Sequence, residues 1–476
     1  MARSITHGID WSPILELEAC KGGTSMSDAQ LPRPTTKDDR EGWLAYWTAL
    51  GMAWRTEPEI GLERQAYLDD RRNNPNYKPD IKQGIYPFKD IKLDRADVEW
   101  LLVTHHGGRW PTEWGRTPPG LRRQGIDLRG ADLRNQNLQR LPLMQLRAGL
   151  DAEDWGKNPP EHRNAAAIHL ECADLHYAYL QDASLRSAHL AGANLQSAHL
   201  EGAMLRGAHF GGYYPEGQTI STRRPREPQI TTLRYAHMDA ETNLPEVQLG
   251  DTAHNYVRLA DAHWNGTDVT RVPWSTLSRT GDEQRARQLI ASNRRESRRQ
   301  RTSEYLIAER SYRQLAAITR SQGLTEDADR FSYRAQLCQR VVLRLQRHYL
   351  RYLGSGFLWL IAGYGYRPWR SVITYAVTIV TFAVFYWCVT NNVSLTHGLF
   401  TYVVAWLGMR PPEPSPEHLQ GYEALVVSVT SFHGRGFQST QSLDDKAAIL
   451  SAIEAAIGLL LEITFIATFT HRFFAR

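Results

Sequence analysis

Two acidic residues and a glycine lie inside an apolar stretch close to the C-terminus. Residues 447–469 are apolar apart from Glu454 and Glu462, and these two carboxylates and Gly458 recur at intervals of four residues. That interval places all three on one face of a helix. Charged groups inside a membrane span face water or another subunit rather than lipid. We therefore expect Glu462 to line a cavity where carboxylates favour cations, and Gly458 to bend the helix or permit close packing. Glu454 either lines the pore or anchors the pore loop from behind by hydrogen bonding.

A glycine-containing segment precedes that stretch. Residues 433–437 read His-Gly-Arg-Gly-Phe and directly follow residues 422–432, an apolar run too short to cross a bilayer. A short re-entrant helix followed by an extended Gly-x-Gly strand can form an ion filter, because non-helical backbone at membrane depth survives only where it lines a water-filled cavity. Glycine permits the dihedral angles that aim successive carbonyls at one axis. The expected filter and pore residues are Phe432, His433, Gly434, Arg435, Gly436 and Phe437.

Two apolar segments must position this filter. Residues 371–390 carry no charge and, as a helix, would cross about 30 Å of hydrocarbon, and residues 447–469 form the second candidate span. A core helix of a soluble protein is the alternative for each segment. Residues 393–409 are also apolar, and we expect them to extend the first helix or to lie at the membrane interface.

The flanking charges predict the orientation of the spans. Arg367 and Arg370 precede the first segment, and Arg472 and Arg476 follow the second, so both ends should face the cytoplasm. Residues 1–13 lack the apolar core of a signal peptide, which favours a cytoplasmic location for everything before the first span.

These segments resemble the two-helix pore module of bacterial potassium-channel-like proteins, and the resemblance covers residues 363–476. It implies a homotetramer around one pore, with potassium or another cation as the permeant ion. The filter departs from the family pattern Thr-Val-Gly-Tyr-Gly, for which this sequence has Phe432-His433-Gly434-Arg435-Gly436. Because four copies of Arg435 would surround one axis, anion conduction stays open as an alternative.

A five-residue period runs through residues 168–211. The large apolar residues are Leu170, Leu175, Leu180, Leu185, Leu190, Leu195, Leu200, Leu205 and Phe210, and from Leu175 onward an alanine stands two residues before each of them. This pattern resembles the pentapeptide-repeat family, whose fold is a right-handed quadrilateral β-helix with four repeats per coil. The same phase is present at Leu128, Leu133, Leu138 and Leu143 and returns at Leu259, Trp264, Val269 and Trp274, with insertions near residues 146–165 and 211–230.

A period of twenty residues per coil predicts a column of histidines. His169, His189 and His209 should stack on one face, about 4.8 Å apart like neighbouring strands. We expect solvated surface residues here, and metal binding or pH sensing is the alternative. The four cysteines show no metal-ligand spacing, so the sequence predicts no metal and no cofactor.

An arginine-rich block precedes the first span. Residues 279–351 contain 17 arginines, no lysine and 8 acidic residues. Residues 304–320 and 327–347 show helical periodicity around a break at Gly323, which predicts a helical hairpin. Basic helices next to a span suit the anionic lipids of the cytoplasmic leaflet. Nucleic-acid binding is disfavoured, because no recognition module accompanies the arginines.

The whole chain has 476 residues, a net charge of +5, 22% charged and 10% aromatic residues, which excludes global disorder and a polytopic membrane protein. The expected fold class is mixed: a cytoplasmic β-helix, an α-helical hairpin linker and a two-helix transmembrane pore domain with a re-entrant pore helix. The expected domains are a disordered segment 1–36, a globular segment or cap 37–120, the repeat 121–275, the hairpin 276–353 and the pore domain 354–476.

These features predict a tetrameric ion channel in a bacterial inner membrane, gated or localised by the repeat, which a cytoplasmic protein or ligand would control. The alternative is a membrane-anchored scaffold that binds a protein partner and has a degenerate, non-conducting or anion-permeable pore. An enzyme is not expected, because the sequence shows no phosphate loop, nucleophile–base pair or metal cluster.

Overall fold

The computed structural model describes residues 33, 34, 36, 38–105, 125–213, 229–249, 256–289, 294–390, 421–434 and 446–474. The chain divides into two compact units, Met1–Ile60 and Gly61–Arg476. In the first unit, helix α2 (Arg40–Ala49) buries Trp43 and Trp47, whose rings stack 5.8 Å apart. Most of the segment expected to be disordered, residues 1–32, lies outside the described residues.

The second unit begins with short helices that precede the first repeat coil. They are α3 (Leu62–Asn73), the 3-10 turn η1 (Pro75–Tyr77) and α4 (Arg95–Thr104). The buried Arg95 guanidinium pairs with Glu99 at 2.7 Å. Its Nη1 donates to the backbone carbonyls of Asn137 at 3.0 Å and Gln139 at 3.1 Å, in the first coil. A buried ion pair thus fixes α4 to the N-terminal end of the repeat.

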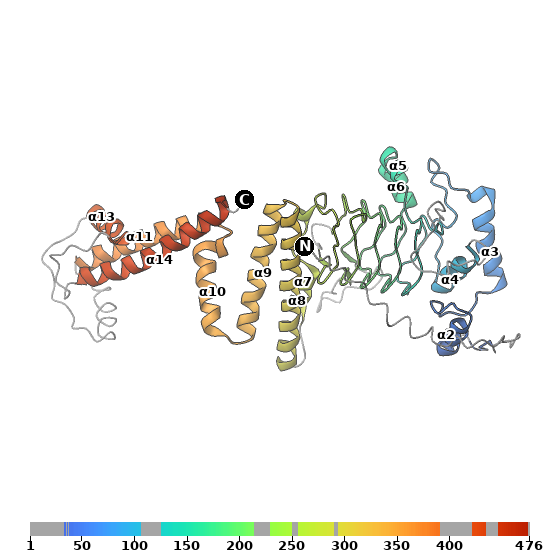
Figure 1. Cartoon of the computed structure of the whole chain (residues 1–476), viewed down its shortest axis with the longest axis horizontal. Coiled ribbons are helices and arrows are strands. Elements are labelled where there is room, and N and C mark those ends of the chain that lie inside the picture. Colours follow the sequence, from blue (N-terminus) through green and yellow to red (C-terminus); the bar gives the residue numbers. More distant parts are fainter. Residues whose placement is uncertain are drawn as a thin grey trace, which may run out of the picture. The chain divides into compact units, whose positions relative to one another are not determined.

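The repeat folds into stacked coils (Figure 1). Parallel bridges join residues twenty apart, such as His169 with His189 and His189 with His209. The large apolar residues and the alanines of the five-residue pattern are buried, for example Leu175, Ala178 and Leu180, all without exposed surface. The apolar phase predicted from the sequence is therefore the core of the coils.

The pentapeptides between residues 168 and 210 turn through left-handed backbone residues. Cys172, Tyr177 and Asp182 have φ of 59°, 56° and 56°, where non-glycine residues are uncommon. Their amides donate to the next coil, as Cys172 does to the Ala191 carbonyl at 3.0 Å. The coil-to-coil hydrogen bonds therefore outweigh the intrinsic preference of these side chains.

Two insertions interrupt the coils where the pattern fails. The first forms α5 (Ala152–Lys157) and α6 (Pro160–Ala166). Its Trp155 lies between the guanidiniums of Arg163 and Arg206, 3.8 and 4.2 Å from the ring centroid, and its Nε1 donates to Ser187 Oγ at 3.0 Å. The second insertion starts with β1 (Gly212–Tyr213), which pairs antiparallel with β2 (Gln229–Thr232), and β2 pairs parallel with β3 (Val257–Arg258).

A buried carboxylate closes the C-terminal end of the repeat. After the 3-10 turn η3 (Trp274–Thr276), helix α7 (Gly281–Gln288) places Asp282 against the last coil. Asp282 Oδ2 accepts from the amides of Leu259 and Ala260, each at 3.1 Å, and Oδ1 accepts from Arg258 Nε at 3.0 Å. Helix α7 also contacts the following helix α8, so it joins the repeat to the helices that follow.

The arginine-rich block forms the predicted hairpin, with different bounds. Helices α8 (Arg294–Ser321) and α9 (Thr325–Leu345) pack against each other, and Gly323, with φ of +81°, lies between them. Helix α8 begins ten residues before the expected start at residue 304. Hydrophobic periodicity cannot detect that first part, because it is almost entirely polar.

A helix that the sequence did not predict follows the hairpin. Helix α10 (Tyr349–Ala362) contacts α9 and leads into the 3-10 turn η4 (Gly363–Gly365). The expected domain boundary between residues 353 and 354 falls inside α10. The hairpin and the C-terminal helices are therefore joined by a continuous helix and not by a linker at that position.

Three helices complete the described fold. They are α11 (Pro368–Thr390), α13 (Gly421–Phe432) and α14 (Lys446–Phe474), and each contacts the other two. Within α11 and α14, Trp369–Cys388 and Ile449–Ala467 are long and apolar enough to cross a membrane. Only 17% and 28% of the residues in these apolar stretches are buried, whereas a core helix of a soluble protein is mostly buried. Residues 393–409 lie outside the described residues.

Candidate functional site

Helix α13 lies beside only half the length of its two neighbours. Near its start, Ala424 clusters with Tyr386 of α11 and Leu450 of α14, close to the end of α11 and the beginning of α14. At its end, Phe432 packs with Leu461, in the middle of α14, and with Tyr375. The helix therefore runs from one end of the α11–α14 pair to its midpoint and stops there.

A serine fixes α13 to both neighbours. Ser428 Oγ lies 2.9 Å from the Ile379 carbonyl of α11 and 2.5 Å from Oε1 of Glu454, which has no exposed surface. A serine hydroxyl has one proton, and a carbonyl can only accept. The Ser428 hydroxyl lies within hydrogen-bond distance of both acceptors and can donate its one proton to either of them. Glu454 thus makes a buried hydrogen bond to α13, the helix that precedes the expected filter.

His433 lies where α13 ends. Its Nδ1 donates to the Val429 carbonyl at 2.8 Å, because a carbonyl can only accept. Its Nε2 lies 2.6 Å from the Tyr375 hydroxyl and 3.5 Å from Oε1 of Glu462. The imidazole therefore connects α11, α13 and α14 at the level where α13 stops, and Glu462 lies at this same level.

Gly458 allows the closest approach between α13 and α14. A Cβ atom at this position would lie 2.1 Å from the Phe432 carbonyl oxygen and 3.2 Å from its ring. Of the two roles expected for Gly458, the structure shows close packing. Phe432 itself is buried, and its ring contacts Tyr375 at a centroid distance of 4.4 Å.

The described part of the expected filter ends at Gly434, whose φ is +70°. Arg435, Gly436 and Phe437 lie outside the described residues. Neither Tyr375 nor Ser428 was predicted from the sequence to belong to the site. Their signal was a polar group within an apolar segment, which in a membrane must find a hydrogen-bond partner.

Arginine–aromatic contacts join the hairpin to the helices of this site. The Arg340 guanidinium of α9 lies 4.9 Å from the Trp359 ring centroid of α10, and Trp359 Nε1 donates to the Tyr333 hydroxyl at 3.1 Å. Arg367, the residue immediately before α11, lies 4.9 Å from the Tyr333 ring. These contacts link α9, α10 and α11.

The predicted histidine column is confirmed. The rings of His169 and His189 stack with centroids 4.7 Å apart, and those of His189 and His209 stack at 5.2 Å. Burial lowers the pKa of His189 to about 4, whereas the hydrogen bond that His169 donates to Glu171 raises the pKa of His169.

A second column was not predicted. It stacks Tyr179, His199, His237 and His263 at centroid distances of 5.1, 4.9 and 4.6 Å. The insertion after residue 211 prevented its prediction, because the spacing from His199 to His237 is no longer twenty residues.

The second column makes a prediction about pH. Burial lowers the pKa of His237, and the facing imidazoles of His199 and His263 lower it further, while Glu201 acts in the opposite direction. The unfolded chain therefore binds this proton more readily than the folded chain. The contribution of neutral His237 to the free energy of unfolding should be fully present above the ordinary histidine pKa of about 6.5. It should decrease as the pH falls below that value.

Thermal melting of the purified chain between about pH 7.5 and pH 5.5 measures this effect. The His237→Gln variant should lose less melting temperature over this range than the wild type. Equal losses in the two proteins would contradict the assignment to His237.

Comparisons with known proteins give a partial match. No curated protein sequence matches the chain. Among solved structures it is similar to HetL, a pentapeptide repeat protein involved in heterocyst differentiation regulation from the cyanobacterium Nostoc sp. strain PCC 7120. The identity is 20% and the TM-score 0.16, over 30% of this chain and 52% of HetL, so the chain spans about half of the length of HetL. It is also similar to the pentapeptide repeat protein Rfr23 from the cyanobacterium Cyanothece 51142, with 21% identity and a TM-score of 0.11 over 29% of this chain and 88% of Rfr23. Residues 173–212 match the family model for pentapeptide repeats in eight copies, so this part of the chain consists of pentapeptide repeats.

Proposed function

We propose that the chain is one subunit of a homotetrameric cation channel in a bacterial inner membrane, with both termini in the cytoplasm. The observation that carries the proposal is helix α13, which is too short to span and is held by Ser428 and His433 so that it ends at the midpoint of α11 and α14. A helix that enters the membrane and ends halfway across it must be followed by non-helical backbone at membrane depth. Such backbone is stable only where it lines a water-filled cavity.

Charges near the end of α13 favour cations. The C-terminal end of a helix carries a partial negative charge of about half an electron. The Glu462 carboxylate lies at the same level, 3.5 Å from His433 Nε2. Glu454 is fully buried against Ser428 whereas the Glu462 side chain is partly exposed, so Glu462 supplies the accessible acidic group of α14 near this point. The carbonyls of residues 433–437 would coordinate the ion.

The remaining parts of the chain take supporting roles in this proposal. Exposed apolar residues cover α11 and α14 and suit lipid, including Val377, Val380, Ile463 and Ile466. The arginines of α8 and α9 would meet anionic lipid headgroups at the cytoplasmic surface. The coils would form the right-handed quadrilateral β-helix of pentapeptide repeats, and this β-helix would gate or localise the channel through α7–α10 and bind a cytoplasmic protein or ligand. On this proposal the chain transports ions and catalyses no reaction.

Reversal potentials test the proposal. Purified chain in a planar bilayer under a KCl gradient should give currents that reverse close to the potassium equilibrium potential. The Glu462→Gln variant should lower the ratio of potassium to chloride permeability by roughly tenfold, because a unit charge about 10 Å from the ion contributes roughly 1.7 kcal/mol at an effective dielectric constant of about 20.

The matched control is Glu423→Gln, which removes the same charge at the opposite end of α13 and should change the ratio much less. Reversal at the chloride equilibrium potential would show an anion channel. The charge of Arg435 would then determine the selectivity in place of that of Glu462. Intact tetramers without current under any condition would contradict the channel and support the membrane-anchored scaffold.

A further inference from the structure

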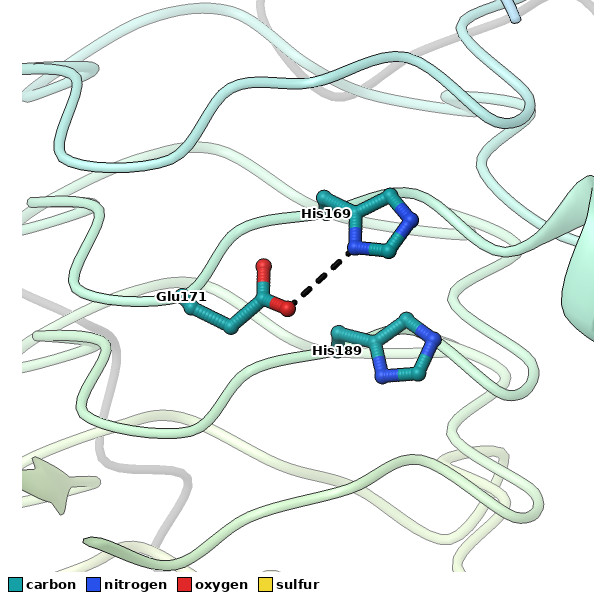
Figure 2. Close-up of side chains that lie close together, drawn as sticks. All are labelled: His169, Glu171 and His189. Atoms are coloured by element: carbon teal, nitrogen blue, oxygen red, sulfur yellow. Dashed lines mark hydrogen bonds and ion pairs between the residues drawn. The ribbon is translucent and has the colours of Figure 1, made fainter. Parts of the chain in front are cut away.

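Three possible metal ligands converge on the surface of the repeat (Figure 2). His169 and Glu171 belong to one coil and His189 to the next, and one donor atom from each lies within 4.8 Å of the other two. His169 Nδ1 lies 3.2 Å from Glu171 Oε1. The group is partly exposed, so an ion from solution can reach it.

The coil geometry brings these three residues together. Leu170 points into the core, so the residues on either side of it, His169 and Glu171, both face outward. The bridge between His169 and His189 places the second imidazole directly beside the first, with ring planes only 4° from parallel. The backbone therefore brings the three side chains together without any ion.

The carboxylate is incompletely satisfied. Oε1 of Glu171 contacts His169, but Oε2 is buried and has no hydrogen-bond partner among the described residues. Buried acceptors without a partner are uncommon in folded proteins and destabilise them. A cation at this position would satisfy the carboxylate.

We propose that His169, Glu171 and His189 bind one divalent first-row transition-metal ion, with zinc as the representative of this class. Two imidazole nitrogens and one carboxylate oxygen are ligands that zinc accepts, and a water molecule completes the tetrahedral set. The site is independent of the proposed pore, since it lies entirely in the coils.

Binding requires a small movement of the side chains. Metal–ligand bonds of about 2.0–2.1 Å place tetrahedral donors roughly 3.3–3.4 Å apart, which the pair His169–Glu171 already approaches. Imidazole lone pairs lie in the ring plane, and the two rings are parallel. One ring must therefore tilt out of the stack so that both nitrogens point at the ion.

A bound ion would join two successive coils. Because the folded chain holds the three donors together and the unfolded chain does not, the metal should stabilise the repeat in proportion to the logarithm of its concentration.

The chain contains a matched control for this site. His199 and Glu201 form the same His-x-Glu pair, with Nδ1 and Oε1 3.3 Å apart, and Glu201 Oε2 is also buried and has no described hydrogen-bond partner. Within the described part of the chain, no third histidine, cysteine or carboxylate completes a three-donor group there. His237 stacks on His199 but is not part of such a group, so comparing the two pairs tests whether three converging donors are needed.

The test uses full-length chain without a polyhistidine tag, stripped of metal by a chelator. Zinc titration in a calorimeter and cobalt titration followed by visible absorption report affinity and tetrahedral geometry. The wild type should bind one ion per chain with the cobalt spectrum of a tetrahedral site. Glu171→Gln and His189→Asn should each weaken binding at least about tenfold, and Glu201→Gln should leave it unchanged.

Circular dichroism of each variant tests whether the coils remain folded. Glu171→Gln changes neither the size nor the shape of the side chain, so misfolding is not expected for this variant. Equal binding by wild type and Glu171→Gln would overturn the proposal. So would an equal loss in Glu171→Gln and Glu201→Gln, since the chain has 17 histidines and scattered weak binding would respond in this way.

Discussion

Replacing Gly458 with alanine should abolish the current of the proposed channel and lower the melting temperature of the helix bundle. The added Cβ would lie 2.1 Å from the Phe432 carbonyl oxygen, far inside van der Waals contact. The nearby atoms are backbone and a buried ring, which cannot move aside as a flexible side chain would. Overpacking of this kind typically costs about 1–3 kcal/mol. The end of α13 would separate from α14, and the filter that begins there would lose its support.

Single-channel recording and thermal melting of the same preparation measure both effects. Gly354→Ala in α10 is the matched control, because its Cβ would meet no atom within 4 Å, and it should leave the current and the melting temperature unchanged. If Gly458 acted only as a hinge, the variant would alter opening and closing but keep the wild-type melting temperature, which would contradict the packing role.

The Asp282→Ala variant should detach α7 from the repeat. Its carboxylate accepts from two backbone amides of the last coil and from Arg258, and it has no exposed surface. Removing it leaves two amides and one guanidinium without this partner. Losing one member of a buried charged pair typically costs about 3–5 kcal/mol. The C-terminal coil should therefore open long before the central coils do.

Hydrogen exchange measures this directly, with faster exchange expected at β3 and α7 and little change near Leu175. Asp268→Ala is the control, since this exposed carboxylate accepts hydrogen bonds from Thr270, two residues further on, and its loss should affect a single turn. Uniformly faster exchange over all coils would show that Asp282 supports the whole repeat rather than its end.

The repeat could be predicted residue by residue, because its pattern is strictly local. Each leucine and alanine of the five-residue period is buried, and the histidine column follows from the same arithmetic. Prediction failed where an insertion changes the count. The stack of His199 on His237 crosses the second insertion, so no fixed spacing in the sequence indicates it.

The helix bundle could be predicted only as elements. Apolar length identified α11, α13 and α14 to within a few residues, and the spacing of Glu454, Gly458 and Glu462 placed them on one face. Their different roles depend on partners in other helices. Ser428 anchors Glu454 and His433 adjoins Glu462, and neither pair is close in the sequence. Helix α10 was missed, since its exposed leucines resemble the start of a membrane segment.

The buried charges at the two ends of the repeat, Arg95–Glu99 at one end and Arg258–Asp282 at the other, differ from the alanine and leucine layers between them. The middle layers are interchangeable, and each needs only a neighbour of the same kind. A duplication or deletion of twenty residues within them would therefore preserve every contact at both ends. Evolution can therefore lengthen or shorten the stack of coils in steps of one coil. The charged residues that terminate the stack can occur only in its first and last coils.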